Sequence, residues 1–346
     1  MPDRPALPPL PIDDVLPQVI DALRRGPCVV LRAPTGAGKT TRVPPAILTA
    51  NLNGAGKILL LQPRRLAARA AAWRMASEAG STVGELVGYQ VRFEGYSSSR
   101  TRILAITEGI ALRMLQDDPF LDDIGAVVLD EFHERNLDAD LTLAMLRKLQ
   151  REARPELKLV VMSATLAAAP LAAYLGDCPI VESQGRLFPV AIDYLPPHAQ
   201  HPLPQAAARG VADVLARTAG DVLVFLPGVA EIRRMHQELA ALANEHNLAV
   251  MQLYGDLPFA EQQAVLERST RRKVILSTNV AETSLTIEGV TAVVDSGLAR
   301  VNRIDPALGL NRLQIERISR ASAEQRAGRA GRTAPGVCLR LWTAAQ

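Results

Sequence analysis

The sequence contains little lysine, few aromatic residues and few cysteines, and it lacks a long apolar segment. Lysine occupies only Lys39, Lys57, Lys148, Lys158 and Lys273, among 39 Lys and Arg residues in total. No apolar run approaches the ~18 residues that a membrane-spanning helix needs. The N-terminal residues also lack the apolar core of a signal peptide. We therefore expect a cytoplasmic protein with no membrane partner.

The three cysteines do not form a recognisable site. Cys28, Cys178 and Cys338 are far apart and make no CxxC pair. The five histidines do not cluster with them. Isolated cysteines of this kind are typical of small, buried apolar residues. The sequence therefore predicts neither a disulfide framework nor a structural metal.

The overall charge and the aromatic content limit how nucleic acid could be bound. The formal net charge is +3, which by itself does not indicate nucleic-acid binding. Aromatic residues make up 4% of the chain, too few for extended base-stacking platforms. Any nucleic-acid contact should therefore grip the backbone, with little sequence preference.

The spacing of apolar residues predicts an α/β fold in two domains. The chain has 346 residues, about twice the usual size of one domain. Continuous apolar runs separated by helical spacing indicate a parallel sheet covered by helices on both faces. The first half predicts strands at 28–32, 58–62, 103–106, 126–129 and 159–162, and clear helices at 67–79 and 137–151.

A second series of strands follows an interruption in this pattern. From about 176 to 204 Gly and Pro cluster and the alternation pauses. The predicted strands then resume at 222–226, 250–254, 274–277, 292–295 and 337–341. We expect one domain over 1–186 and another over 187–346, each a mainly parallel sheet flanked by helices.

The first predicted strand runs into a loop with the features of a phosphate site. Gly36 and Gly38 permit backbone angles that let successive N–H groups face a phosphate. Lys39 stands out in a chain where Arg fills most other basic positions, because a flexible ammonium can follow phosphate oxygens. The Thr40 hydroxyl is a candidate Mg²⁺ ligand. The residues expected to bind nucleotide here are Thr35, Gly36, Ala37, Gly38, Lys39, Thr40 and Thr41.

This loop departs from the general GxxxxGK[ST] pattern in two ways. Its first position is Ala33 where the pattern has glycine. Pro44 and Pro45 follow shortly after, and proline removes helical hydrogen bonds. We therefore expect that the next helix cannot run straight on from Lys39.

A carboxylate pair follows the predicted strand 126–129. Taken alone, Asp130-Glu131 would usually be an exposed turn. With a phosphate loop elsewhere in the same sheet, Asp130 becomes a candidate Mg²⁺ ligand and Glu131 a candidate base for the attacking water.

The motif order resembles the DEAH/RHA group of superfamily 2 helicases. Besides the phosphate loop, the chain contains DEFHER at 130–135, QPRR at 62–65, TEG at 107–109, SAT at 163–165, TNVAETS at 278–284 and QRAGRAGR at 325–332. DEFHER and VVDSGLAR at 293–300 are most similar to the bacterial HrpB type of ATP-dependent helicase. The resemblance implies two RecA-like domains that hydrolyse ATP or another NTP at their interface. It also implies single-stranded RNA across both domains and 3′-to-5′ movement.

The resemblance adds further residues to the nucleotide site. It implies that Arg74, His133 and Ser163 take part in nucleotide binding. The second half has no GK[ST] of its own, so it should not bind phosphates independently. Its segment 325–332 resembles the motif that carries arginine fingers. Gln325, Arg329 and Arg332 are therefore implied catalytic residues.

The spacing within this segment carries its own prediction. Arg326, Arg329 and Arg332 are three residues apart, so on one helix they would share nearly one face. An exposed cationic helix face is the alternative interpretation.

Candidate nucleic-acid contacts lie in loops after the predicted strands. They are Arg64, Arg92, Thr107 and Gly109 in the first half, and Gly228, Asn279 and Thr283 in the second. Arg92 matches a family turn that hooks the RNA backbone. The segment 300–320 resembles the family's β-hairpin, a candidate strand-separating wedge.

Two other functions remain open on the sequence. The same motor could move on DNA, or an NTP-driven assembly switch could use it without translocation. Family members carry further domains after the last motif. We therefore expect a monomeric helicase core with RNA-stimulated ATPase activity and weak unwinding. The sequence does not show which protein partners, if any, the chain has.

Overall fold

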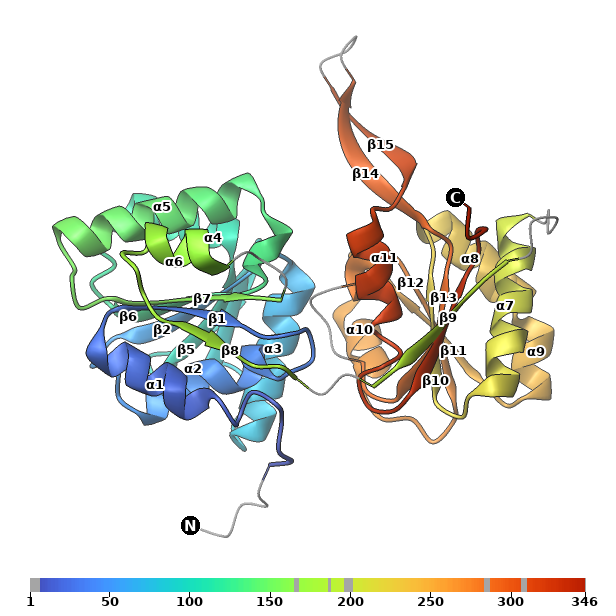
Figure 1. Ribbon diagram of the computed structural model, residues 1–346, viewed down its shortest axis with the longest axis horizontal. Helices are drawn as coiled ribbons and strands as arrows, with labels where there is room; N and C mark the ends of the chain where they lie inside the picture. Colours follow the sequence, from blue (N-terminus) through green and yellow to red (C-terminus); the bar gives the residue numbers. More distant parts are fainter. Residues whose placement is uncertain are drawn as a thin grey trace. The chain divides into compact units, whose positions relative to one another are not determined.

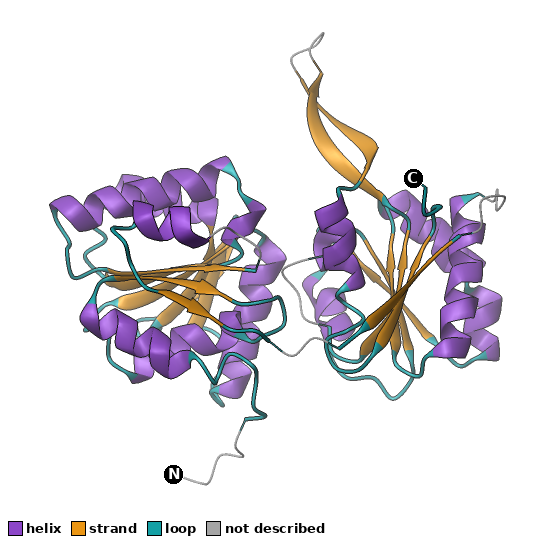
Figure 2. Cartoon of the chain, in the orientation of Figure 1, coloured by secondary structure: helices purple, strands orange, loops and turns teal. Residues whose placement is uncertain are grey.

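The computed structural model describes residues 7–164, 168–185, 188–195, 202–282, 287–305 and 310–345. The chain divides into two compact units, unit 1 (Met1–Arg186) and unit 2 (Leu187–Gln346) (Figure 1). Each unit is a sheet with helices on both faces (Figure 2), as predicted. Within the described ranges, no helix is both long enough and apolar enough to cross a membrane.

The sheet of unit 1 has eight strands, in the order β4-β3-β5-β2-β6-β7-β1-β8. Neighbouring strands are parallel except β4, which is antiparallel to β3. Parallel strands end at the same edge of a sheet, so the loops after β3, β5, β2, β6, β7 and β1 lie along one edge. The strands are β1 (Cys28–Arg32), β2 (Lys57–Gln62), β3 (Val87–Val91), β4 (Glu94–Tyr96), β5 (Ile103–Thr107), β6 (Ile124–Leu129), β7 (Lys158–Ser163) and β8 (Ile180–Glu182).

Six α-helices cover the two faces of this sheet. The core on one face includes α1 (Leu16–Arg25), α2 (Lys39–Thr49) and α3 (Arg65–Glu78). The core on the other face includes α4 (Glu108–Asp117), α5 (Leu137–Glu152) and α6 (Ala168–Tyr174). A short 3₁₀ helix, η1 (Phe132–Glu134), follows β6. Burying apolar strands from both sides is what their continuous apolar sequences require.

Several strands were absent from the sequence prediction. β3 contains Gly88 and Gln90, which interrupt its apolar run. The predicted pause at about 176–204 was wrong in part, because it contains β8 and β9 (Val190–Tyr194). These two are edge strands with exposed residues, so neither forms a continuous apolar segment.

Unit 2 has a six-stranded parallel sheet, in the order β11-β12-β10-β13-β16-β9. Besides β9, its strands are β10 (Asp221–Phe225), β11 (Ala249–Leu253), β12 (Lys273–Ser277), β13 (Val290–Asp295) and β16 (Gly336–Arg340). Figure 1 shows α7 (Leu203–Arg217), α8 (Val229–Glu238) and α9 (Ala240–Glu245) on one side, with α10 (Phe259–Leu266) and α11 (Arg320–Ala327) on the other. The 3₁₀ helix η2 (Asn279–Ala281) follows β12.

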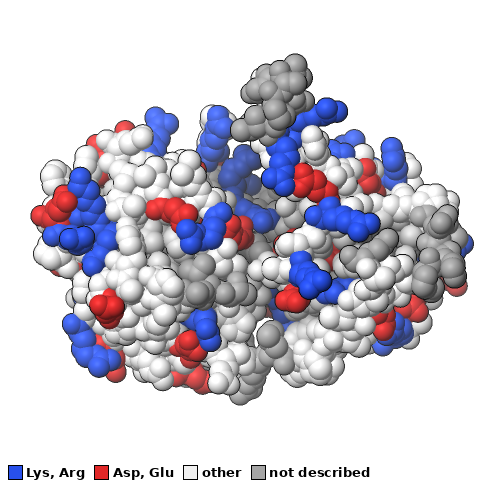
Figure 3. Space-filling view, turned by 45° about the horizontal axis from the view of Figure 1, so that its top comes forward, with Lys and Arg blue, Asp and Glu red and all other residues white. Residues whose placement is uncertain are grey.

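A two-stranded hairpin projects from unit 2. β14 (Leu298–Asp305) pairs antiparallel with β15 (Leu310–Arg317), which confirms the predicted hairpin. Arg300, Arg303, Arg312 and Arg317 are exposed on it. Lys and Arg side chains gather along the described part of this hairpin in Figure 3.

Candidate functional site

The phosphate-type loop joins β1 to α2 in unit 1, as the sequence predicts. Gly36 has a φ of 85° and Gly38 a φ of 93°, both in the left-handed region that favours glycine. A Cβ on Gly38 would also lie 2.6 Å from Leu10 Cδ1. Thr35 and Gly36 are accessible, whereas Ala37 is buried and its carbonyl accepts the N–H of Ile12. The segment that contains Leu10 and Ile12 therefore packs against the buried side of the loop and fixes its position.

Ala33 replaces the first glycine of the general pattern without disturbing the loop. Its N–H donates to the Ser163 carbonyl at 3.0 Å, which extends the pairing of β1 with β7. Because its φ is not in the left-handed region, alanine is acceptable there. The substitution therefore changes no backbone requirement.

The expectation for α2 was wrong. The helix begins at Lys39 and runs to Thr49 with Pro44 and Pro45 inside it. Both prolines lie in its first two turns, where two helical hydrogen bonds are lost. Val43, Pro44 and Ile47 are buried against the sheet. This packing holds the helix in place despite the lost hydrogen bonds.

Lys39 and Glu131 form a buried ion pair. Lys39 Nζ lies 2.7 Å from Glu131 Oε1, and the two side chains are 3% and 5% exposed. Glu131 has a φ of 50°, an unusual angle for a residue other than glycine. Backbone strain of this kind is concentrated at functional sites. The pair joins the start of α2, which follows β1, to the end of β6, and one strand, β7, lies between β1 and β6 in the sheet.

Asp130 lies directly beside this pair. Its Oδ2 accepts the Thr40 hydroxyl at 2.5 Å and the Gln62 side-chain amide at 2.8 Å. Its Oδ1 accepts the N–H of Glu131. Burial raises the pKa of Asp130 above its ordinary value, although the charge of Lys39 opposes the shift. The carboxylate and hydroxyl oxygens of Asp130 and Thr40 are the hard donors that Mg²⁺ prefers, so they fit this ion.

His133 and Ser163 are close to the same carboxylates. His133 Nδ1 accepts the N–H of Ala164 at 3.3 Å and lies 3.5 Å from Glu131 Oε2. Neutral imidazole therefore carries its proton on Nε2. Ser163 is the buried last residue of β7. Thr41 donates its hydroxyl to the Gly38 carbonyl at 3.4 Å. Arg74 lies on α3, where its Nε donates to Glu78 at 2.6 Å.

The candidate nucleic-acid residues of unit 1 follow three adjacent strands. Arg92 follows β3, Thr107 ends β5 with Gly109 just beyond it, and Arg64 follows β2. The strand order β3-β5-β2-β6 places this row beside Asp130 on the same edge of the sheet. One half of the edge thus carries the candidate nucleotide residues and the other half the candidate nucleic-acid residues.

The segment after Glu131 contacts the half of this edge that carries the candidate nucleic-acid residues. Glu134 Oε2 accepts from Arg64 Nη2 at 3.2 Å. Asn136 caps α5 and donates to Glu108 at 2.6 Å. Sequence reasoning did not assign roles to Gln62 or Glu134. The available signal was their membership of two quoted motifs, Gln62 in QPRR and Glu134 in DEFHER.

The arginine segment of unit 2 does not form one helix face, so that expectation was wrong. Helix α11 ends at Ala327, and Arg329 and Arg332 lie in the turn after it. Gln325 is half-buried on α11. Arg329 is buried and its Nε donates to the Glu282 carbonyl at 2.8 Å. Gly328 has a φ of −59°, and a Cβ there would lie 3.4 Å from the Glu324 carbonyl oxygen, so this position does not require glycine.

Arg326 is a structural residue that sequence reasoning did not recognise. It is fully buried, and it donates to Glu282 at 2.8 Å and to Asp295 at 2.9 Å. Its guanidinium also lies 4.7 Å from the centre of the Phe225 ring. These contacts tie α11 to β10, β13 and the end of η2.

The remaining predicted contacts of unit 2 are on separate loops. Gly228 caps α8, where a Cβ would lie 2.9 Å from Arg300 Nε. Asn279 is exposed at the start of η2. Thr283 lies outside the described residues.

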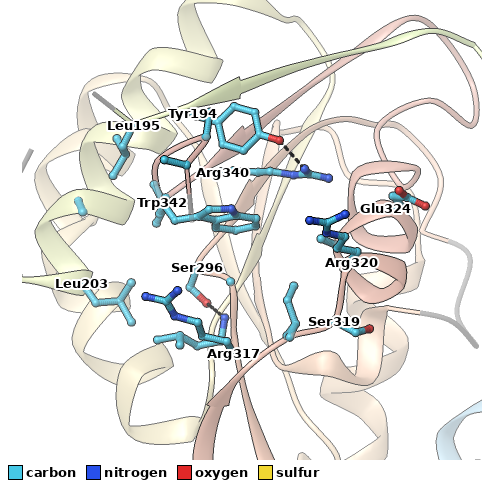
Figure 4. A pocket seen from close by; sticks show the side chains of 18 residues that line it. Tyr194, Leu195, Leu203, Ser296, Arg317, Ser319, Arg320, Glu324, Arg340 and Trp342 are labelled. Carbon is cyan, nitrogen blue, oxygen red and sulfur yellow. Dashed lines mark hydrogen bonds between the residues drawn. The ribbon is translucent and has the colours of Figure 1, made fainter. Parts of the chain in front are cut away.

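Unit 2 also has a pocket of about 580 Å³ at the ends of β9, β13 and β16. Arg340 donates to the Tyr194 hydroxyl at 2.7 Å and lies 5.5 Å from the Trp342 ring (Figure 4). Arg317 and Arg320 also line this pocket. The lining contains no glycine loop with Lys and Thr, so it does not repeat the phosphate site of unit 1.

A strand, a glycine loop, a helix that begins at Lys39 and an acidic pair after a nearby strand define a P-loop nucleoside-triphosphatase fold. Residues 15–173 match the DEAD/DEAH box helicase family, and residues 207–334 match the helicase conserved C-terminal domain. Together these matches cover most of the chain and confirm two tandem RecA-like domains. The chain belongs to the DEAD/DEAH box helicases.

Individual relatives refine this assignment. The chain is 47% identical over 334 residues to the ATP-dependent RNA helicase HrpB of Escherichia coli (strain K12), a match that covers 96% of this chain and 41% of that protein. It is 39% identical over 347 residues to the probable ATP-dependent RNA helicase DHX34 of Homo sapiens, covering 96% of this chain and 30% of that protein. The chain thus spans about two fifths or less of the length of these relatives.

A solved structure agrees with these matches. The crystal structure of the Escherichia coli DEAH/RHA helicase HrpB aligns with a TM-score of 0.89 at 46% identity, over 97% of this chain and 43% of that one. The resemblance to the DEAH/RHA group and to its HrpB type is therefore confirmed.

Proposed function

We propose that this chain is the motor core of an ATP-dependent RNA helicase that uses Mg²⁺ and moves 3′-to-5′ on single-stranded RNA. The observation that carries the proposal is the buried cluster in which Lys39 pairs with Glu131 while Thr40 pairs with Asp130. It supports the proposal because the candidate phosphate-binding lysine, the candidate Mg²⁺ ligands and the candidate base lie in one buried cluster. The names of the relatives support RNA as substrate.

In this proposal each residue of the cluster in unit 1 has its own role in hydrolysis. Lys39 would neutralise the β- and γ-phosphates, and the backbone N–H groups around Gly36 and Gly38 would surround them. Asp130 and Thr40 would hold Mg²⁺, which supplies charge neutralisation at the transferring phosphoryl group. Glu131 would accept the proton of the attacking water once Lys39 turns to the phosphates. His133, beside Glu131, would take part in nucleotide binding.

Unit 2 would supply the remaining groups. It contains no second glycine loop with Lys and Thr, so the same nucleotide would serve both units. Arg329 and Arg332 would stabilise the charge of the transition state, and Gln325 would hold the water or a phosphate oxygen. Hydrolysis that needs both units would couple each cycle to their movement relative to each other. The cytoplasmic location and the monomeric state stay predictions.

The test compares ATP hydrolysis alone, with single-stranded RNA and with single-stranded DNA of the same sequence. We expect RNA to stimulate hydrolysis most, and Glu131→Gln to abolish turnover while retaining nucleotide binding. Equal or greater stimulation by DNA would overturn the RNA preference. Hydrolysis indifferent to both nucleic acids would favour an assembly switch. Turnover retained in Glu131→Gln would refute the assigned base.

Direction of movement needs its own measurement. A motor that moves 3′-to-5′ displaces streptavidin from biotin at the 5′ end of an RNA faster than from the 3′ end. The opposite preference would overturn the proposed direction and leave the hydrolysis assignment untouched.

A further inference from the structure

The turn between β3 and β4 presents an aromatic side chain to solvent. Phe93 is 90% exposed, more than any other large apolar side chain of the described residues. Such a side chain contributes little to the core, because its apolar surface stays in water. A role in stability therefore does not account for it.

The backbone at Phe93 is also unfavourable for a bulky residue. Val91 pairs with Glu94, so Arg92 and Phe93 form a two-residue connection between antiparallel strands. Phe93 has a φ of 68°, in the left-handed region where Gly or Asn is usual. The turn carries strain that glycine would remove. An observed strain of this kind points to a function for the side chain.

Arg92 lies against the same ring. Its guanidinium carbon is 4.7 Å from the centre of the Phe93 ring, a cation–π contact. Both side chains are exposed. The turn therefore offers a flat aromatic surface with a positive charge beside it. A nucleobase and its neighbouring phosphate have the complementary properties.

The strands beneath the turn are fixed to the body of unit 1. Glu94 accepts hydrogen bonds from Arg69 on α3 and from the Tyr89 hydroxyl. Burial, helped by the bond to Glu94, raises the pKa of Tyr89, so this hydroxyl stays a donor. Arg69 compensates the charge of Glu94, which reduces its repulsion of a phosphate. The turn is thus presented on a fixed support.

The turn lies on the sheet edge that carries the other candidate nucleic-acid residues. β3 is parallel to β5 and neighbours it, and β5 neighbours β2. The turn after β3 therefore continues the row formed by Thr107 and Arg64. We propose that Phe93 stacks on one base of a bound single strand while Arg92 contacts its adjacent phosphate. This inference rests on the proposed function, because it adds a base contact to the same RNA-binding edge.

The test replaces Phe93 with Ala, Gly and Trp. The dissociation constant of a fluorescein-labelled oligo(U) should rise about 5- to 100-fold for Phe93→Ala and Phe93→Gly, and Phe93→Trp should retain affinity. Phe93→Gly should also raise the thermal unfolding midpoint, because it relieves the left-handed strain. Affinity and stability would then change in opposite directions, which a merely structural role cannot produce.

Phe120→Ala is the matched control. Phe120 is 55% exposed and precedes β6, so it lies at the opposite edge of the sheet. Its removal should leave affinity unchanged. A 2-aminopurine base in the RNA should lose its quenching with Phe93→Ala and keep it with Phe120→Ala.

The outcomes separate this inference from the proposed function. RNA binding and quenching that survive both Phe93→Ala and Phe93→Gly would overturn the stacking role alone. A wild-type chain that binds no RNA would overturn the proposed function and the stacking role together.

Discussion

Arg64 at the start of α3 and Glu134 in η1 are joined by a hydrogen bond of 3.2 Å between Nη2 and Oε2. Their side chains are 27% and 17% exposed. Arg64 is a candidate RNA contact, and Glu134 lies three residues beyond the candidate base Glu131. The pair therefore connects the proposed RNA-binding row to the proposed site of hydrolysis through one short loop.

Neutralising Glu134 should free Arg64 for RNA. Without nucleotide, Glu134→Gln should lower the dissociation constant for single-stranded RNA about 3- to 10-fold, because a half-buried ion pair of about 1 kcal/mol no longer competes with phosphate. Fluorescence anisotropy measures this. Glu156→Gln is the control, since Glu156 pairs with Arg154 before β7, at the opposite sheet edge. If Glu134→Gln bound single-stranded RNA more weakly than wild type, Glu134 would not be competing with RNA phosphate for Arg64.

Breaking the pair of Lys39 and Glu131 should destabilise unit 1. Lys39→Met leaves Glu131 buried without its partner, which costs about 3–5 kcal/mol in the free energy of unfolding. Urea unfolding followed by Trp73 in a Trp342→Phe background reports on unit 1. Lys57→Met is the control, because Lys57 forms a 3.9 Å pair with Asp123, whose side chain is 88% exposed. If Lys39→Met and Lys57→Met lowered the free energy of unfolding by the same amount, the result would argue against a strong buried pair between Lys39 and Glu131.

Glu108 should make stability depend on pH. Burial raises its pKa from 4.5 to about 7, although the hydrogen bond from Asn136 opposes the shift. Folded protein then binds the proton more tightly than unfolded protein, so stability falls as pH rises from about 4.5 to about 7 and is level above that.

The loss corresponds to about 3 kcal/mol over this interval. Glu108→Gln cannot titrate, and it should flatten this dependence and stabilise unit 1 at pH 8. Unfolding curves at pH 5 and pH 8 measure both effects. An equal pH dependence in wild type and Glu108→Gln would show that another group is responsible.

Arg326 should be essential for the fold of unit 2. Arg326→Gln leaves Glu282 and Asp295 without their buried cation, with an expected loss of about 3–5 kcal/mol. The fluorescence of Trp342 in a Trp73→Phe background follows the unfolding of unit 2. Arg320→Gln, an exposed change on the same helix, should have little effect. A stable Arg326→Gln variant that loses hydrolysis would instead indicate a catalytic role for Arg326.

Arg332 should act on the rate and not on nucleotide binding. Arg332→Lys keeps the charge but loses the planar fork, and kcat should fall about 10³-fold. The dissociation constant of a nucleotide should stay close to wild type, as measured by a fluorescent analogue. Arg320→Lys again serves as control. A kcat within a few-fold of wild type would remove Arg332 from the proposed mechanism.

The sequence was informative wherever function depends on local geometry. Strand 28–32 was predicted with its observed bounds, and Gly36 and Gly38 have the left-handed angles expected of them. Core strands are continuous apolar runs, so their pattern is visible without a structure. Edge strands β8 and β9 are short and partly exposed, so they leave no such pattern.

Predictions based on local rules alone failed where packing decided the outcome. Proline removes helical hydrogen bonds, yet α2 continues because its buried side chains hold it against the sheet. A spacing of three suggested one face for Arg326, Arg329 and Arg332, but α11 ends at Ala327, so of these three only Arg326 lies on the helix. No pattern in the sequence shows which of several arginines will be buried.

By itself, the sequence determined the chemical groups of this protein: a phosphate loop, an acidic pair and an arginine segment, each at the end of a recognisable strand or loop. Only the tertiary structure decided which of them meet. Lys39 meets Glu131, and Arg64 meets Glu134, because the order of parallel strands places distant loops on one edge. Strand order arises from contacts between residues far apart in the chain, and local residue patterns do not encode those contacts.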